Sequence, residues 1–73
     1  MTAIVVKHWG TKPAAHACLV EWLELSPPEA DDVLRAQLPW TTELPDEAAA
    51  GFARCLRARA GATVADAPVA VSI

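Results

Sequence analysis

The sequence predicts an α+β fold, in which a three-stranded antiparallel sheet carries three helices packed on one face, in the order β-α-α-β-α-β. Three observations predict it: a β-branched run opens the chain, three later segments have helical apolar spacing, and two short strand-like segments flank the last of them. A chain of 73 residues buries only about 60% of its unfolded surface, which suits one domain. We place that domain at residues 1–66 and a tail at 67–73.

The first strand and the first helix follow from the opening third of the chain. Residues 3–8, AIVVKH, end at Trp9 and Gly10, as expected for a strand followed by a turn. Apolar side chains then recur at helical spacing over residues 13–25, and Pro13 suits a first helical turn. The predicted core face comprises Ala15, Cys18, Leu19 and Trp22.

A capping signal marks the start of the second helix. Ser26 and Glu29 have the spacing at which each side chain bonds the backbone N–H of the other. Pro39 ends the helix, and almost no loop separates it from the first, so the two form a hairpin. Its predicted inward residues are Ala30, Val33, Leu34 and Leu38.

The remaining elements are a short strand, a helix and a final strand. Residues 40–43 lie between two prolines and predict a short edge strand. A proline and two acidic residues at 45–47 open the third helix, which ends at Gly61. Its predicted core residues are Ala48, Phe52, Cys55, Leu56 and Ala60. Residues 62–65 predict the last strand, and Pro68 limits pairing in the tail.

Charge and hydropathy exclude two classes of partner. The net charge is −3, and the only basic cluster, Arg54, Arg57 and Arg59, fits cations that complement the end of a helix dipole. Nucleic acid is therefore not an expected partner. No apolar run reaches the roughly 18 to 20 residues of a membrane span, and the first residues do not resemble a signal peptide. We expect a cytoplasmic protein without a membrane partner.

The two cysteines lie on predicted core faces, so we expect both Cys18 and Cys55 to be free, buried thiols. A disulfide between the first and third helices is the less favoured alternative. Together with His8 and His16 the cysteines supply four metal donors by number, but their spacing matches no structural zinc site. We therefore expect no metal and no cofactor.

Candidate catalytic residues are also few, and the sequence predicts that the chain is not an enzyme. Two acidic pairs lie on outward helix faces, where contact with solvent explains the carboxylates without a catalytic role. These pairs are Glu21 with Glu24 and Asp31 with Asp32. His16 and Cys18 are two positions apart on a helix and do not face each other, and the three glycines are isolated rather than forming a phosphate loop.

The chain resembles the C-terminal domain of the bacterial ribosomal stalk protein, which recruits translational GTPases. The resemblance rests on the opening strand, the turn at residues 10–12, the Glu29–Ala30 pair and the ending AGATV at 60–64, and it covers residues 3–66. It implies an adaptor-like fold and a protein partner. A related fold belongs to the adaptor that delivers N-end-rule substrates to an ATP-dependent protease, but its Asn-Asp pair is replaced here by residues 8–10, HWG.

The departures from the stalk family concern its partner-binding residues. Of the four basic positions that engage the GTPases, only Lys12 is retained, and the others fall on Ala17, Val20 and Asp31. The resemblance therefore implies a shared fold with a different partner. The first helix presents a more apolar surface than the family's basic patch, which favours a contact that depends less on salt.

We therefore expect a protein–protein interaction module that acts as a small adaptor or scaffold, with an unidentified protein partner or a second copy of the chain. The alternatives are recruitment of a GTPase factor to the ribosome and substrate delivery to an ATP-dependent protease. The expected binding residues lie on the outward face of the first helix and beside the turns. They are Lys12, Pro13, His16, Ala17 and Val20, with Trp9 and Trp40, for which a core or edge-covering role is the slightly favoured alternative.

Overall fold

The computed structural model describes residues 1–68. Its elements in chain order are β1 (Thr2–His8), α1 (Lys12–Leu23), α2 (Pro27–Arg35), β2 (Trp40–Leu44), α3 (Asp46–Cys55), the π-helical turn η1 (Leu56–Ala60) and β3 (Thr63–Pro68). The strands form one antiparallel sheet in the order β2-β1-β3. The predicted α+β class and the order β-α-α-β-α-β are confirmed. No helix within residues 1–68 has the length and apolar character needed to cross a membrane.

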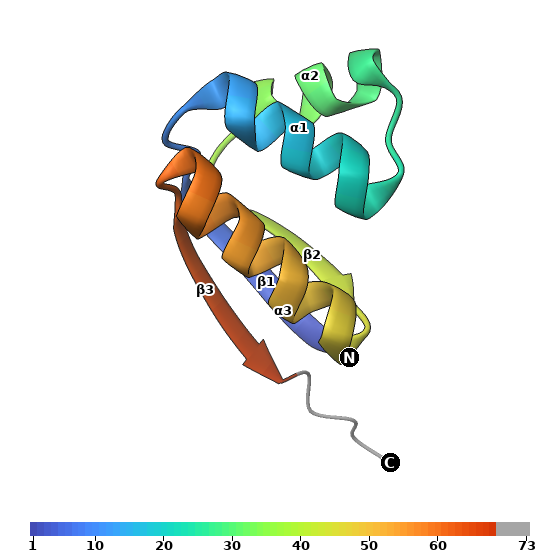
Figure 1. Cartoon of the computed structure of the whole chain (residues 1–73). Coiled ribbons are helices and arrows are strands. Elements are labelled where there is room, and N and C mark those ends of the chain that lie inside the picture. Colours follow the sequence, from blue (N-terminus) through green and yellow to red (C-terminus); the bar gives the residue numbers. More distant parts are fainter. Residues whose placement is uncertain (69–73) are drawn as a thin grey trace.

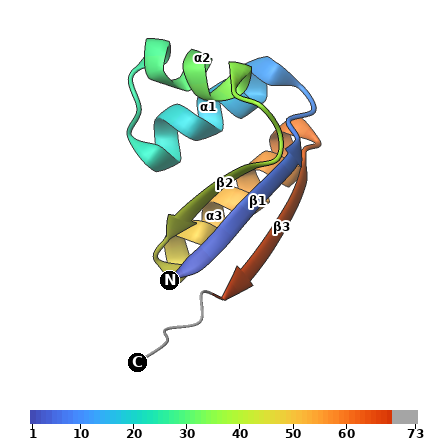
Figure 2. The same ribbon diagram turned by 180° about the vertical axis from the view of Figure 1, so that it is seen from behind.

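The sheet is built around β1, and its alternating side chains decide which face is covered. Ile4 and Val6 are fully buried on the face that α3 crosses, because successive strand residues point to opposite sides. Helix α3 lies against all three strands, whereas α1 contacts α2, α3 and η1 (Figure 1). Figure 2 shows the opposite face of the sheet without a helix over it, and α1 and α2 beyond one end of the strands.

Phe52 of α3 is the largest fully buried side chain, as its predicted core position requires. On the predicted inward face of α1, Ala15, Cys18 and Leu19 are fully buried as expected, whereas Trp22 is only half-buried and packs against the core cluster. On α2 the capping box is present: the Glu29 N–H donates to the Ser26 hydroxyl, and the Ser26 N–H donates to the Glu29 carboxylate over 3.2 Å.

The turn after β1 is held against the end of η1. The Thr11 N–H donates to the carbonyl oxygen of Ala60 over 2.8 Å. Gly10 has φ 70° and lies so close that a β-carbon there would overlap the same carbonyl group. Gly61 ends the helix at φ 66°, as the sequence predicts, so these two glycines permit the close crossing.

Three element ends differ from prediction. Helix α2 ends at Arg35 rather than at Pro39, because Ala36 already adopts an extended conformation at φ −63° and ψ 151°. Helix α1 ends at Leu23 rather than residue 25, because Glu24 adopts a left-handed conformation at φ 54°. Strand β3 continues to Pro68, which pairs with Thr2, so the sheet extends past residue 66 into the predicted tail. Pro68 is tolerated because β3 is an edge strand, where a missing N–H need not break a ladder. The rest of the predicted tail, residues 69–73, lies outside the described residues.

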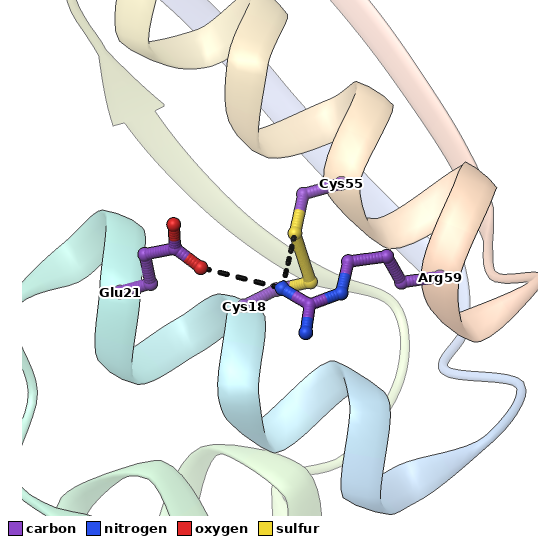
Figure 3. A network of polar contacts seen from close by, with 4 residues as sticks. All are labelled: Cys18, Glu21, Cys55 and Arg59. Carbon is purple, nitrogen blue, oxygen red and sulfur yellow. Dashed lines mark hydrogen bonds and ion pairs between the residues drawn. A yellow bond between two sulfur atoms is a disulfide. The ribbon is translucent and has the colours of Figure 1, made fainter.

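The prediction of free thiols is wrong, because Cys18 and Cys55 form a disulfide between α1 and α3 (Figure 3). Their Cα atoms lie 6.1 Å apart, within the range that a disulfide spans. The predicted burial is correct for Cys18, which is fully buried, whereas Cys55 is only half-buried. Only the crossing of α1 with α3 brings them together, and helical spacing within each segment does not reveal that crossing.

Candidate functional site

An open groove between α1 and α2 is the candidate site, and we call it the α1–α2 groove. It has a volume of about 410 Å³. Its lining residues are Lys12, Pro13, His16, Asp31, Leu34 and Arg35. Three of these residues, Lys12, Pro13 and His16, belong to the face that the sequence predicts for partner binding. The groove exists because the capped α2 folds back beside α1 after a very short connection.

His16 of α1 contacts two residues of α2 across the groove. Its Nε2 atom lies 3.1 Å from the carbonyl oxygen of Pro27 and 3.4 Å from Oδ1 of Asp31. Both partners are hydrogen-bond acceptors, so Nε2 must carry the proton. The imidazole is 28% exposed and therefore forms part of the wall that a ligand would meet.

The charges of the groove are not balanced within the described part of the chain. Asp31 faces His16, but neither Lys12 nor Arg35 has an ion-pair partner among residues 1–68, and both are exposed. Between them Pro13 is exposed and Leu34 is half-buried, so an apolar surface lies beside two available cations. This combination suits a short peptide segment with one apolar and one acidic side chain.

Two residues of the predicted face are less accessible than expected. Ala17 and Val20 were expected to point largely outward, but both are half-buried, and Val20 packs against the core cluster. Neither lines the α1–α2 groove. The reason is tertiary, because α2 and the core occupy space on a side of α1 that would be free in an isolated helix.

Trp9 does not belong to an exposed binding surface. Trp9 is only 3% exposed, and its ring centroid lies 5.5 Å from that of Trp40, which is half-buried. The two rings are tilted by 42° and pack as a pair. They are not brought together with the α1–α2 groove and contribute to the core instead. The core role that the sequence slightly favours describes Trp9 correctly.

Sequence reasoning missed Asp31, Leu34 and Arg35 as groove residues. Asp31 was assigned to the outward face of the second helix and Leu34 to its inward face, and Arg35 was not among the expected binding residues. The predicted helical hairpin was the available signal, because it implies that one side of each helix faces the other. Helical periodicity alone did not show that Leu34 would remain accessible at the edge of that contact.

The structure gathers no recognisable catalytic arrangement in the α1–α2 groove. Within residues 1–68 no group of three or more His, Cys, Asp or Glu side chains is placed to hold a metal ion. The two sulfur atoms considered as zinc ligands are bonded to each other. The lining residues of the α1–α2 groove can make hydrogen bonds, apolar contacts and ionic contacts with a bound molecule.

No protein-family model, curated protein or solved structure matches the chain.

Proposed function

We propose that this chain is a non-enzymatic protein-binding module, a small adaptor or scaffold whose α1–α2 groove receives a short segment of a partner protein. The observation that carries the proposal is the placement of Pro13 and Leu34 beside two cations, Lys12 and Arg35, that are unpaired within residues 1–68. The bound segment would place an apolar side chain against Pro13 and Leu34 and a carboxylate near the cations.

The resemblance to the ribosomal stalk domain supports a binding role at this end of the molecule. Lys12, the one retained basic position, is exposed at the groove, which favours recruitment of a GTPase factor as the second candidate function. Asp31 argues for a different partner, because it replaces a basic residue of the family and lies 3.4 Å from His16. An acidic partner surface would meet mixed charge here rather than a uniform basic patch.

Selection of binding peptides from a displayed random library would test the proposal. Peptides that bind through the groove should carry an acidic residue beside an apolar one, and should shift the backbone amide resonances of Lys12, His16, Leu34 and Arg35. Lys12→Glu with Arg35→Glu should weaken binding by roughly tenfold or more, since the cations would be replaced by repelling charges.

Lys7→Glu with Arg54→Glu is the matched control, because it makes the same double charge reversal at two exposed residues that do not line the groove. It should leave peptide affinity nearly unchanged. Binding should also weaken moderately as salt is raised, since two cations contribute beside an apolar contact. Resonance shifts confined to other surfaces, or equal losses in both variants, would contradict the proposal.

A further inference from the structure

The two sulfur atoms of the disulfide differ in accessibility. Cys18 is fully buried in the core, whereas Cys55 is partly exposed at the surface of α3. Thiol–disulfide exchange requires the attacking thiolate to reach one sulfur atom directly. Cys18 is out of reach of a thiol in solution, so the attack has to occur at Cys55, which lines a surface groove.

A second groove, which we call the disulfide groove, lies next to Cys55. It has a volume of about 390 Å³, and Trp22, Arg54 and Arg59 contribute to its lining. Cys55 therefore borders a concave surface that carries one aromatic, two cationic and one acidic side chain, the last from Glu21.

Arg59 connects the sulfur with the charges of the disulfide groove (Figure 3). Its Nη1 atom lies 3.9 Å from Sγ of Cys55 and 3.3 Å from Oε2 of Glu21. Arg54 is exposed and has no ion-pair partner within residues 1–68. Because Glu21 neutralises one of the two arginines, the disulfide groove keeps one positive charge beside Cys55.

We propose that Cys55 is a site of thiol–disulfide exchange with a small thiol that carries carboxylates, which is held by Arg54 and Arg59 in the disulfide groove. The thiolate of the small molecule attacks Sγ of Cys55 and forms a new sulfur–sulfur bond. The Cys18–Cys55 bond breaks, and its electron pair leaves on Cys18, which takes a proton from water. Attack by the Cys18 thiolate on Cys55 reverses the step and expels the small thiolate.

The arginines have separable roles in this reaction. Arg59 lies against the sulfur and stabilises the negative charge that is shared between sulfur atoms during the exchange. Arg54 lines the disulfide groove without a recorded contact to either sulfur, so it acts on the carboxylates of the incoming thiol. Loss of Arg54 should therefore affect an anionic thiol and not a neutral one.

The test uses the oxidised full chain and glutathione as the probe, with acid quenching, alkylation and peptide mass spectrometry. The mixed disulfide should form on Cys55, and its appearance on Cys18 would overturn the proposal. Because this measurement needs no substitution, it remains decisive if a cysteine variant fails to fold. In the single variants, Cys18→Ala should react with oxidised glutathione at least about tenfold faster than Cys55→Ala, whose remaining thiol is buried.

The charge dependence completes the test. Arg54→Gln should slow reduction by glutathione roughly two- to fivefold and leave reduction by neutral 2-mercaptoethanol unchanged. Lys7→Gln, which makes the same charge change outside both grooves, should slow neither reaction. Equal effects of Arg54→Gln and Lys7→Gln, or equal slowing of both thiols by Arg54→Gln, would overturn recognition of carboxylates in the disulfide groove.

Discussion

Trp22 of α1 lies directly over Gly51 of α3, so closely that a β-carbon on Gly51 would overlap the indole ring. This contact lets the two helices approach on the side of the disulfide. A glycine inside a helix lowers stability by about 1 kcal/mol relative to alanine, so its presence at residue 51 has a packing reason.

Gly51→Ala should therefore destabilise the protein by about 1–2 kcal/mol, because crowding of Trp22 outweighs the gain in helix propensity. Urea unfolding followed by circular dichroism would measure it. In a Trp22→Ala background the same Gly51→Ala change should instead stabilise by about 1 kcal/mol. The same sign in both backgrounds would show that the indole ring does not restrict this position.

Removal of the Phe52 ring should have a large effect on stability. Phe52 is fully buried between α3 and the sheet, and Phe52→Ala should destabilise by about 3–5 kcal/mol, enough to unfold a domain of this size. Phe52→Leu, which retains most of the apolar volume, should remain folded. A Phe52→Ala variant with an unchanged melting temperature would contradict the placement of this side chain.

The disulfide should stabilise the fold through the length of chain that it closes. Cys18 and Cys55 are 37 residues apart, for which restriction of the unfolded chain predicts about 2–4 kcal/mol. The urea midpoint should fall by a corresponding amount when a reducing agent is added. The double variant Cys18→Ala with Cys55→Ala should unfold at the same urea midpoint with and without reductant. A wild-type midpoint that does not change when reductant is added would argue against the disulfide.

The capping box of α2 should give the fold a specific dependence on acid. The Ser26 hydroxyl, and then the Ser26 backbone N–H, hold the pKa of Glu29 below its ordinary value of 4.5. A carboxyl whose pKa is lowered by folding adds stability above its unfolded pKa and loses that stability as pH falls through the folded pKa. Ser26→Ala should therefore be less stable than wild type at neutral pH, with the difference shrinking below pH 4.5.

Unfolding curves over a pH series would measure this difference, and a carbon-detected NMR titration would follow the Glu29 carboxyl directly. Its pKa should rise toward the ordinary value in Ser26→Ala. Ser26→Thr is the control, because its hydroxyl can keep the hydrogen bond. A stability difference that is independent of pH would mean that the Glu29 carboxylate does not take part in the cap.

Val20→Glu should lower stability by about 1–3 kcal/mol, because a carboxylate would replace a half-buried apolar side chain against the core. The sequence alone predicts no such loss, since it places Val20 on the outward face. Lys12→Glu, on the exposed rim of the α1–α2 groove, should change stability by less than about 0.5 kcal/mol. Equal melting temperatures for the two variants would restore the outward assignment of Val20.

Part of the candidate site could be predicted from local signals. Pro13 and His16 are three positions apart and so lie on the same side of a helix, and the Ser26–Glu29 spacing predicts that a second helix begins soon afterwards. Those two signals predict a helix–helix junction at the site. They do not predict which residues of the second helix line the groove, because the rotation of one helix against another is set by side chains from the whole core.

The sequence by itself determined the class of this fold, the order of its elements and the caps and turns at Ser26 and Gly61, because propensity, spacing and capping are properties of neighbouring residues. Only the tertiary structure decided which distant residues meet. It joined Cys18 to Cys55, buried Trp9 against Trp40 and placed Arg35 opposite Lys12 across the α1–α2 groove. These pairings depend on how α1 crosses α3 and on how α2 folds back. Packing of the complete core sets both angles, and no single segment contains that information.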